Sequence, residues 1–142
     1  LLLQQGRLDD AARQFSTVLR REPDHPGARL GHAWTLLYRG ESEKAHRTFE
    51  AIHRAEPNAY ALFGAGLALL QMERLEEAER TFREVLVVDP EYWQAWGNLA
   101  DLYDRQGELD RAAEAYREVL EANPRDERAR QWLRAHPDAG GR

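Results

Sequence analysis

The chain has 142 residues, of which 42% are apolar and 32% are charged, and its formal net charge is −5. This length is typical of one domain, and the negative charge makes nucleic acid or an anionic membrane surface an unfavourable partner. Because there is no cysteine, disulfide frameworks, thiolate zinc sites and cysteine nucleophiles are excluded. The longest apolar run, residues 61–70, is about half of the ~20 residues that a membrane-spanning helix needs, so we expect no membrane insertion.

A repeat of 33 or 34 residues runs along the chain. Three residue types recur in the same register: Phe15, Phe49, Phe82 and Tyr116; Ala11, Ala45, Ala78 and Ala112; Pro23, Pro57, Pro90 and Pro124. Gly6, Gly40 and Gly107 keep this register as well, and Glu73 stands where a fourth glycine would be. Between these marks apolar residues recur at spacings of three and four, which is typical of amphipathic helices.

Each period therefore predicts a helix, a short turn, a second helix and a proline that ends it. Residues 1–25 form a partial repeat, in which residues 1–5 supply the last turn of a first helix before a turn at Gly6. Complete repeats follow at 26–58, 59–92 and 93–126. Residues 127–136 predict a capping helix, because terminal repeats need their apolar face covered, and residues 137–142 predict a flexible tail.

The fourth unit resembles the tetratricopeptide repeat (TPR) most closely. The matching residues are Trp96, Leu99, Ala100, Tyr103, Gly107, Ala112, Tyr116 and Pro124. The second unit departs from the family pattern, with Arg29 and His32 at sites usually held by tryptophan and leucine. The resemblance implies an all-α fold, a right-handed α-solenoid of antiparallel helix pairs that forms a TPR superhelix.

The resemblance also implies that the first helix of each unit lines a concave groove in which TPR proteins bind peptides or other proteins. Carrying that pattern over predicts a partner-binding groove lined by Leu30, Trp34, Leu37, Tyr38, Tyr60, Phe63, Leu67, Leu70, Gln94, Asn98, Asp101 and Arg105, with Gly64 and Asp104 beside them.

An argument independent of the family supports the middle part of this groove. The segment 59–72 is apolar nearly all round, and such a helix has to be covered on every side. Tyr60, Phe63, Leu67 and Leu70 have no evident partner within the chain, so we expect them to face a partner protein. The alternative is that neighbouring first helices bury them.

Chaperone-binding TPR domains hold a C-terminal carboxylate with lysine, arginine and asparagine in the groove. Here the matching sites hold Leu30, Trp34, Gly64, Gln94 and Asn98. Only one amide fits and no cation does, which disfavours a role as a cochaperone that binds a chaperone tail.

The sequence offers little for catalysis. His46, Glu50 and His53 lie at i, i+4 and i+7 of one helix, a pattern that could bind a divalent ion, but no fourth ligand is near and a structural role is favoured. His32 replaces an apolar packing residue and predicts a hydrogen-bonded core histidine. We therefore expect no catalytic residue, no metal and no cofactor.

The favoured interpretation is a non-enzymatic scaffold that binds an apolar or amphipathic peptide or protein segment in the groove. One alternative is the repeat region of a larger multidomain enzyme or of a secretion or assembly machine. Another is a structural module that stacks end to end into homo-oligomers.

Overall fold

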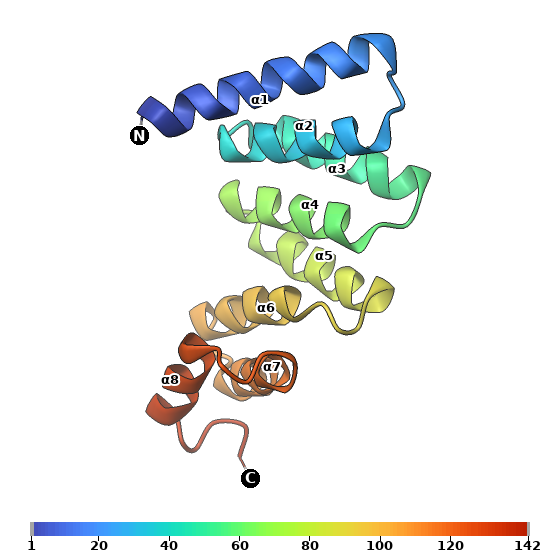
Figure 1. The fold of residues 1–142 in the computed structure, drawn as a ribbon. Helices are drawn as coiled ribbons and strands as arrows, with labels where there is room; N and C mark the ends of the chain where they lie inside the picture. The colour runs from blue at the N-terminus through green and yellow to red at the C-terminus, as the bar shows by residue number, and fades with distance from the viewer. Residues whose placement is uncertain (1, 142) are drawn as a thin grey trace. The chain divides into compact units, whose positions relative to one another are not determined.

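The computed structural model describes residues 2–141, and all the regular structure in this range is helical (Figure 1). Eight helices follow one another: α1 (Leu2–Arg21), α2 (Pro26–Tyr38), α3 (Ser42–Ala55), α4 (Ala59–Gln71), α5 (Leu75–Val88), α6 (Trp93–Arg105), α7 (Leu109–Ala122) and α8 (Glu127–Ala135). The predicted all-α fold of paired helices is thus confirmed. None of these helices has the length and apolar character needed to cross a membrane.

The recurring prolines end the second helix of each pair, as the sequence predicts. α3 ends at Ala55 and α7 at Ala122, each two residues before a proline. The intervening residues, Glu56 and Asn123, have left the helical conformation, with φ of −151° and −134°. Steric contact with the proline ring disfavours the helical conformation for the preceding residue.

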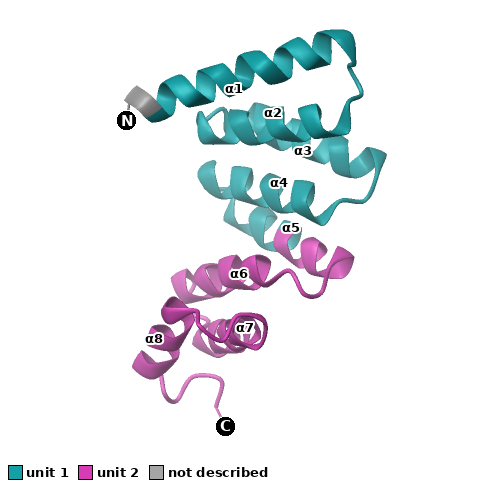
Figure 2. Cartoon of the chain, viewed as in Figure 1, with its two compact units in different colours: residues 1–81 teal, residues 82–142 magenta. Residues whose placement is uncertain are grey.

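The chain divides into two compact units, residues 1–81 and residues 82–142, with the boundary inside α5 (Figure 2). In the first unit, α2, α3 and α4 pack in succession, and α2 also touches α4. Their core consists of Ala33, Leu36, Leu37, Ala45, Phe49, Ala61, Ala65 and Ala68. The many alanines allow the helix backbones to approach closely.

Two aromatic rings of the first unit lie over glycines of the following helix. The ring of Phe15 on α1 occupies the space where a side chain of Gly31 on α2 would stand. In the same way, a Cβ atom added to Gly64 on α4 would lie 2.5–2.7 Å from the ring of Phe49 on α3. At Phe15 and Phe49 the recurring aromatic residue therefore packs into the next repeat, where a glycine leaves room for the ring.

In the second unit, α6 packs on α7 and α7 packs on α8. Leu99 and Leu102 of α6 are buried, as are Ala112 and Val119 of α7. The hydroxyl of Tyr103 accepts hydrogen bonds from Arg83 at 3.0 Å and from Arg111 at 3.1 Å. α8 lies where the sequence predicts a capping helix.

Helix α1 differs from the sequence prediction. It continues through Gly6 without the predicted turn, so the first helix pair of the partial repeat is one helix of 20 residues. A Cβ atom added to Gly6 would meet nothing within 4 Å.

The segment after α8, predicted to be a flexible tail, packs back on α7. Arg117 donates to the carbonyl of Ala139 at 3.0 Å, and the backbone N–H of Gly140 donates to Asp110 at 2.7 Å. Ala139 is only 8% exposed. These tertiary hydrogen bonds hold the segment against α7. The glycine-rich composition of the segment does not reveal them.

The turns within the helix pairs share one geometry. Gly40 has φ of 79° and Gly107 has φ of 76°, and in both turns the next N–H bonds a carbonyl five residues back, at 2.9 Å and 2.8 Å. Glu73 adopts the same left-handed conformation, with φ of 56°, and the following Arg74 makes the equivalent bond at 2.9 Å. The repeat register predicted for Glu73 is therefore correct, and a residue with a Cβ atom occupies a glycine position.

We expect Glu73→Gly to raise the free energy of unfolding by about 0.5–1 kcal/mol. The left-handed conformation costs a residue with a Cβ roughly 1–2 kcal/mol, and the extra backbone entropy of glycine offsets part of the gain. The reverse change, Gly107→Ala, should lower the unfolding free energy by about 1 kcal/mol. Urea denaturation measures both, and equal stability of all three proteins would contradict the strain at Glu73.

A second prediction concerns the glycine beneath Phe49. Gly64→Ala should cost about 1–3 kcal/mol of stability, because the added methyl group collides with a buried ring. Gly97→Ala is the control, since a Cβ atom there would meet its nearest neighbour, Val119, at 3.9 Å. Glycine inside a helix is disfavoured, so this control should stabilise the protein by roughly 0.5–1 kcal/mol. Thermal unfolding of the two variants should therefore shift in opposite directions.

Candidate functional site

The predicted groove residues lie on three helices that belong to different units. Those from Leu30 to Leu70 lie on α2 and α4 of the first unit, and those from Gln94 to Arg105 lie on α6 of the second.

An aromatic cluster, formed by Trp34, Tyr38 and Tyr60, lies on the face shared by α2 and α4. The ring centre of Trp34 is 5.9 Å from that of Tyr38, one turn further along α2, and 4.8 Å from that of Tyr60 on α4. Both tyrosines are exposed, Tyr38 by 65% and Tyr60 by 48%. Each presents an apolar ring and a hydroxyl group to solvent.

Trp34 connects the two tyrosines of this cluster to the core of the first unit. Its ring meets that of Phe49 edge to face at a centroid distance of 5.0 Å, and the rest of the side chain packs against the core of the first unit. Its indole N–H is buried and has no hydrogen-bond partner among residues 2–141. Trp34 is therefore held in place by packing, and the two tyrosines form the accessible part of the cluster.

Two predicted groove residues of the first unit are buried instead. Leu37 is 2% exposed and Phe63 is 9% exposed, so the expectation that they face a partner is wrong. Leu37 belongs to the core cluster, because α3 and α4 cover that side of α2. The alternative reading of the 59–72 helix, burial by its neighbours, holds for Phe63.

Leu30, Leu67 and Leu70 lie between these extremes. Each is partly buried, and Leu30 and Leu67 pack against the core cluster. Gly64 is also buried, beneath Phe49, and not in the groove. The sequence contained a signal that could have predicted the burial of Gly64. Gly31 and Gly64 are one period apart, and each comes in the helix after a recurring aromatic residue.

The groove residues of the second unit follow one face of α6. Gln94 and Arg105 are exposed and Asn98 is partly exposed, with its amide donating to the carbonyl of Gln94 at 2.9 Å. Asp101 is engaged within the unit. Its Oδ1 accepts from the Tyr116 hydroxyl at 2.7 Å, and its Oδ2 lies 2.6 Å from the guanidinium of Arg128.

This network joins α6, α7 and the capping helix α8. Tyr116 is 4% exposed, and its ring packs on that of Trp132 at a centroid distance of 4.9 Å. Burial and the hydrogen bond to Asp101 raise the pKa of Tyr116, so its hydroxyl stays protonated and keeps donating. Asp101 thus holds the cap, which removes it from the set of side chains free to bind a partner.

The histidines have separate structural roles. His46 lies 3.6 Å from Glu50, whereas Nδ1 of His53 accepts the backbone N–H of Asn58 at 3.0 Å, beside the start of α4. Within residues 2–141 no three His, Asp or Glu side chains are grouped to hold a metal ion. The prediction that His32 is hydrogen-bonded is wrong for its Nδ1, which is buried and has no hydrogen-bond partner in the part of the chain that the structure describes.

Comparison with known proteins agrees with this architecture. Residues 2–68 and residues 63–127 each match the family described as Tetratricopeptide repeat. The chain is 31% identical over 97 residues to the Protein CTR9 homolog of Arabidopsis thaliana, a match that covers 67% of this chain and 9% of that protein. The chain thus spans about a tenth of the length of this relative.

Two solved structures are similar in fold. One is MamA, with a TM-score of 0.79 and 24% identity, covering 92% of this chain and 77% of MamA. The other is the first TPR of Spaghetti (RPAP3) bound to the HSP90 peptide SRMEEVD, with a TM-score of 0.73 and 17% identity, covering 81% of this chain and 94% of that one. At this level of identity the likeness shows the fold alone.

The network at Asp101 generates a stability prediction. Asp101→Ala leaves the buried Tyr116 hydroxyl without its acceptor, so the unfolding free energy should fall by about 1–3 kcal/mol. Arg128→Ala removes only the ion pair, whose arginine side chain is 72% exposed, and should cost less than about 1 kcal/mol. Denaturation of both variants measures the difference, and equal losses would mean that the Tyr116 hydrogen bond contributes little.

Proposed function

This chain belongs to the tetratricopeptide repeat family, and from that premise we propose that it is a non-enzymatic scaffold that binds an apolar or amphipathic segment of another protein. The observation that carries the proposal is the aromatic cluster of the first unit. Tyr38 and Tyr60, exposed by 65% and 48%, both contact the ring of Trp34, and Trp34 packs against the core.

Such a cluster has the properties of a binding hot spot. Tyrosine and tryptophan supply a large contact area and lose little side-chain entropy, and Trp34 is already ordered by Phe49 before a partner arrives. The partly buried Leu30, Leu67 and Leu70 on the same two helices add apolar surface at its edges. A helix or an extended peptide with aliphatic or aromatic anchors fits this chemistry.

An acidic chaperone tail does not fit it. The related Spaghetti domain holds the peptide SRMEEVD, but the positions that match the carboxylate clamp carry Leu30, Trp34, Gly64, Gln94 and Asn98 here. Leu30 and Trp34 pack against the core, Gly64 is buried, and none of the five is a cation. The ligand we propose is therefore held by apolar contact and not by its terminal carboxylate.

A second candidate is the repeat region of a larger protein that presents a substrate to another domain. The short span of the chain relative to its curated relatives, 9% of the Protein CTR9 homolog, favours this reading. The aromatic cluster would serve the same docking role in either case.

The test starts from peptides selected by the purified chain from a random display library. We expect these peptides to carry aliphatic or aromatic anchors, and Tyr38→Ala with Tyr60→Ala to weaken their binding by at least ~30-fold, since truncation of an aromatic hot spot costs on the order of 2 kcal/mol or more. Calorimetry measures the affinities, and raising the salt concentration should change them little because the contact is apolar.

The matched control is Val87→Ala with Leu109→Ala, which removes two exposed apolar side chains of the second unit. It should bind the peptides normally. Circular dichroism should show that both double variants keep their helices. Unchanged affinity of the folded Tyr38/Tyr60 variant would place the docking surface elsewhere, and its unfolding would show that the tyrosines belong to the core.

A further inference from the structure

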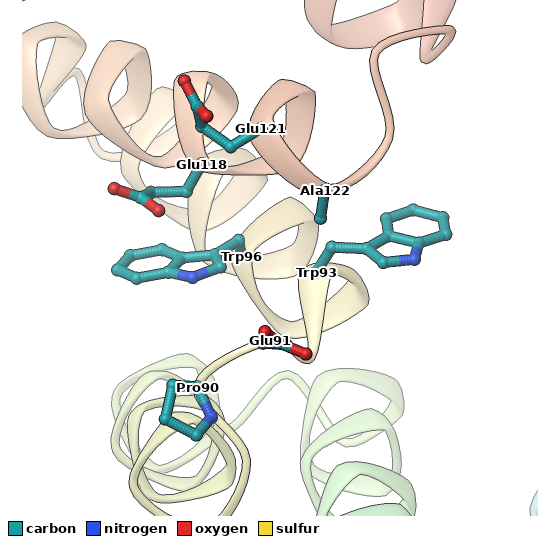
Figure 3. A pocket seen from close by; sticks show the side chains of 7 residues that line it. All are labelled: Pro90, Glu91, Trp93, Trp96, Glu118, Glu121 and Ala122. Carbon is teal, nitrogen blue, oxygen red and sulfur yellow. The ribbon is translucent and has the colours of Figure 1, made fainter.

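A pocket of about 450 Å³ lies in the second unit, between the start of α6 and the end of α7. Figure 3 shows its lining: Pro90, Glu91, Trp93, Trp96, Glu118, Glu121 and Ala122. It shares no residue with the aromatic cluster of the first unit. Its lining thus combines two tryptophans with three glutamates.

The three carboxylates of this pocket make no ion pair with the described residues. Other glutamates of the chain do, such as Glu108 with Arg111 at 2.7 Å and Glu77 with Arg74 at 2.6 Å. Glu121 also lies in the last turn of α7, where there is no basic residue, and Glu118 immediately precedes that turn. The negative end of the helix dipole makes this an unfavourable place for anions and a favourable one for a cation.

The indole of Trp96 adds a second attraction for a cation. Trp96 is partly buried, and in Figure 3 its ring lies between Pro90 and the carboxylate of Glu118. An aromatic face attracts a positive charge, and indole does so most strongly. The ring of Trp93 extends in the opposite direction in this view, so the two indoles do not face each other.

The equivalent pocket of the first unit shows that this charge is not required by the repeat. That pocket, of about 330 Å³, has Arg29 at the position of Trp96. In the same register, 67 residues earlier, Ala51 replaces Glu118 and Arg54 replaces Glu121. The repeat therefore forms with basic residues at two of these positions. The pocket of the first unit keeps acidic residues in Asp24 and Glu56 but has no tryptophan, so the combination of an indole with glutamates from α7 distinguishes the pocket of the second unit from it.

We infer that this pocket binds an arginine side chain of a partner protein. A guanidinium stacks on an indole through its planar face and donates paired N–H bonds to a carboxylate at its edge. A trimethylated ammonium is recognised by several aromatic rings around it and has no N–H group to donate to a carboxylate. One ring with three unpaired carboxylates matches the guanidinium.

The test follows the four indole N–H signals of the whole chain by two-dimensional NMR during titration with the capped tripeptide acetyl-Gly-Arg-Gly-amide. We expect Trp96 to shift with a dissociation constant of roughly 0.1–1 mM, since exposed charge pairs contribute little each, while Trp34 stays unchanged. The same peptide with citrulline, which is neutral, should cause no shift. Tighter binding of the trimethyl-lysine peptide would overturn the inference.

Glu118→Gln with Glu121→Gln should weaken the arginine peptide at least 5-fold. The charge-matched control, Glu76→Gln with Glu84→Gln, removes two exposed glutamates that do not line the pocket and should leave the affinity unchanged. Trp96→Leu should abolish binding and still fold, because the third repeat carries Leu62 at this position. Equal weakening by the two Glu→Gln pairs would show general charge attraction and refute a site. Failure of the arginine peptide to bind would leave the docking role of Tyr38 and Tyr60 unaffected, because that cluster is tested with different peptides.

Discussion

The rest of the first unit depends on the packing of an aromatic ring against a glycine of the following helix. Phe49 is fully buried, and its ring fills the space above Gly64 that a Cβ atom would need. Close packing leaves no room for adjustment in such a contact. The same arrangement at Phe15 and Gly31 joins α1 to α2, so the same steric contact connects one repeat to the next twice within this unit.

The candidate docking surface follows from this packing. Because Phe49 is fixed, it holds the ring of Trp34 in an edge-to-face contact. The ring of Trp34 in turn packs against the rings of Tyr38 and Tyr60. The exposed aromatic rings are therefore ordered by the core and not by a ligand, which lowers the entropy lost on binding. In the second unit polar bonds connect the helices instead, since Asp101 of α6 binds both Tyr116 of α7 and Arg128 of α8.

The repeats differ most where their helices end. Gly40, Glu73 and Gly107 adopt the same left-handed conformation in their turns. Of these three, Glu73 has a Cβ atom and is therefore strained. The pockets beside α2 and α6 have equivalent positions but different linings, with Arg29 in one where the other has Trp96, and with Glu118 and Glu121 in the second pocket only. A repeat constrains the packed face of its helices, whereas exposed positions are free to acquire separate binding properties.

The amino-acid sequence by itself determined the helix pairs, their register and the family, because the spacing of aromatic, alanine and proline residues is a local property of the chain. Tyr38 and Tyr60, which the sequence assigns to the groove, are exposed. Only the tertiary structure decided that Leu37 and Phe63 are buried, that Asp101 holds the cap and that the last residues pack on α7. These outcomes depend on which helices cover each face, and periodicity along one helix does not contain that information.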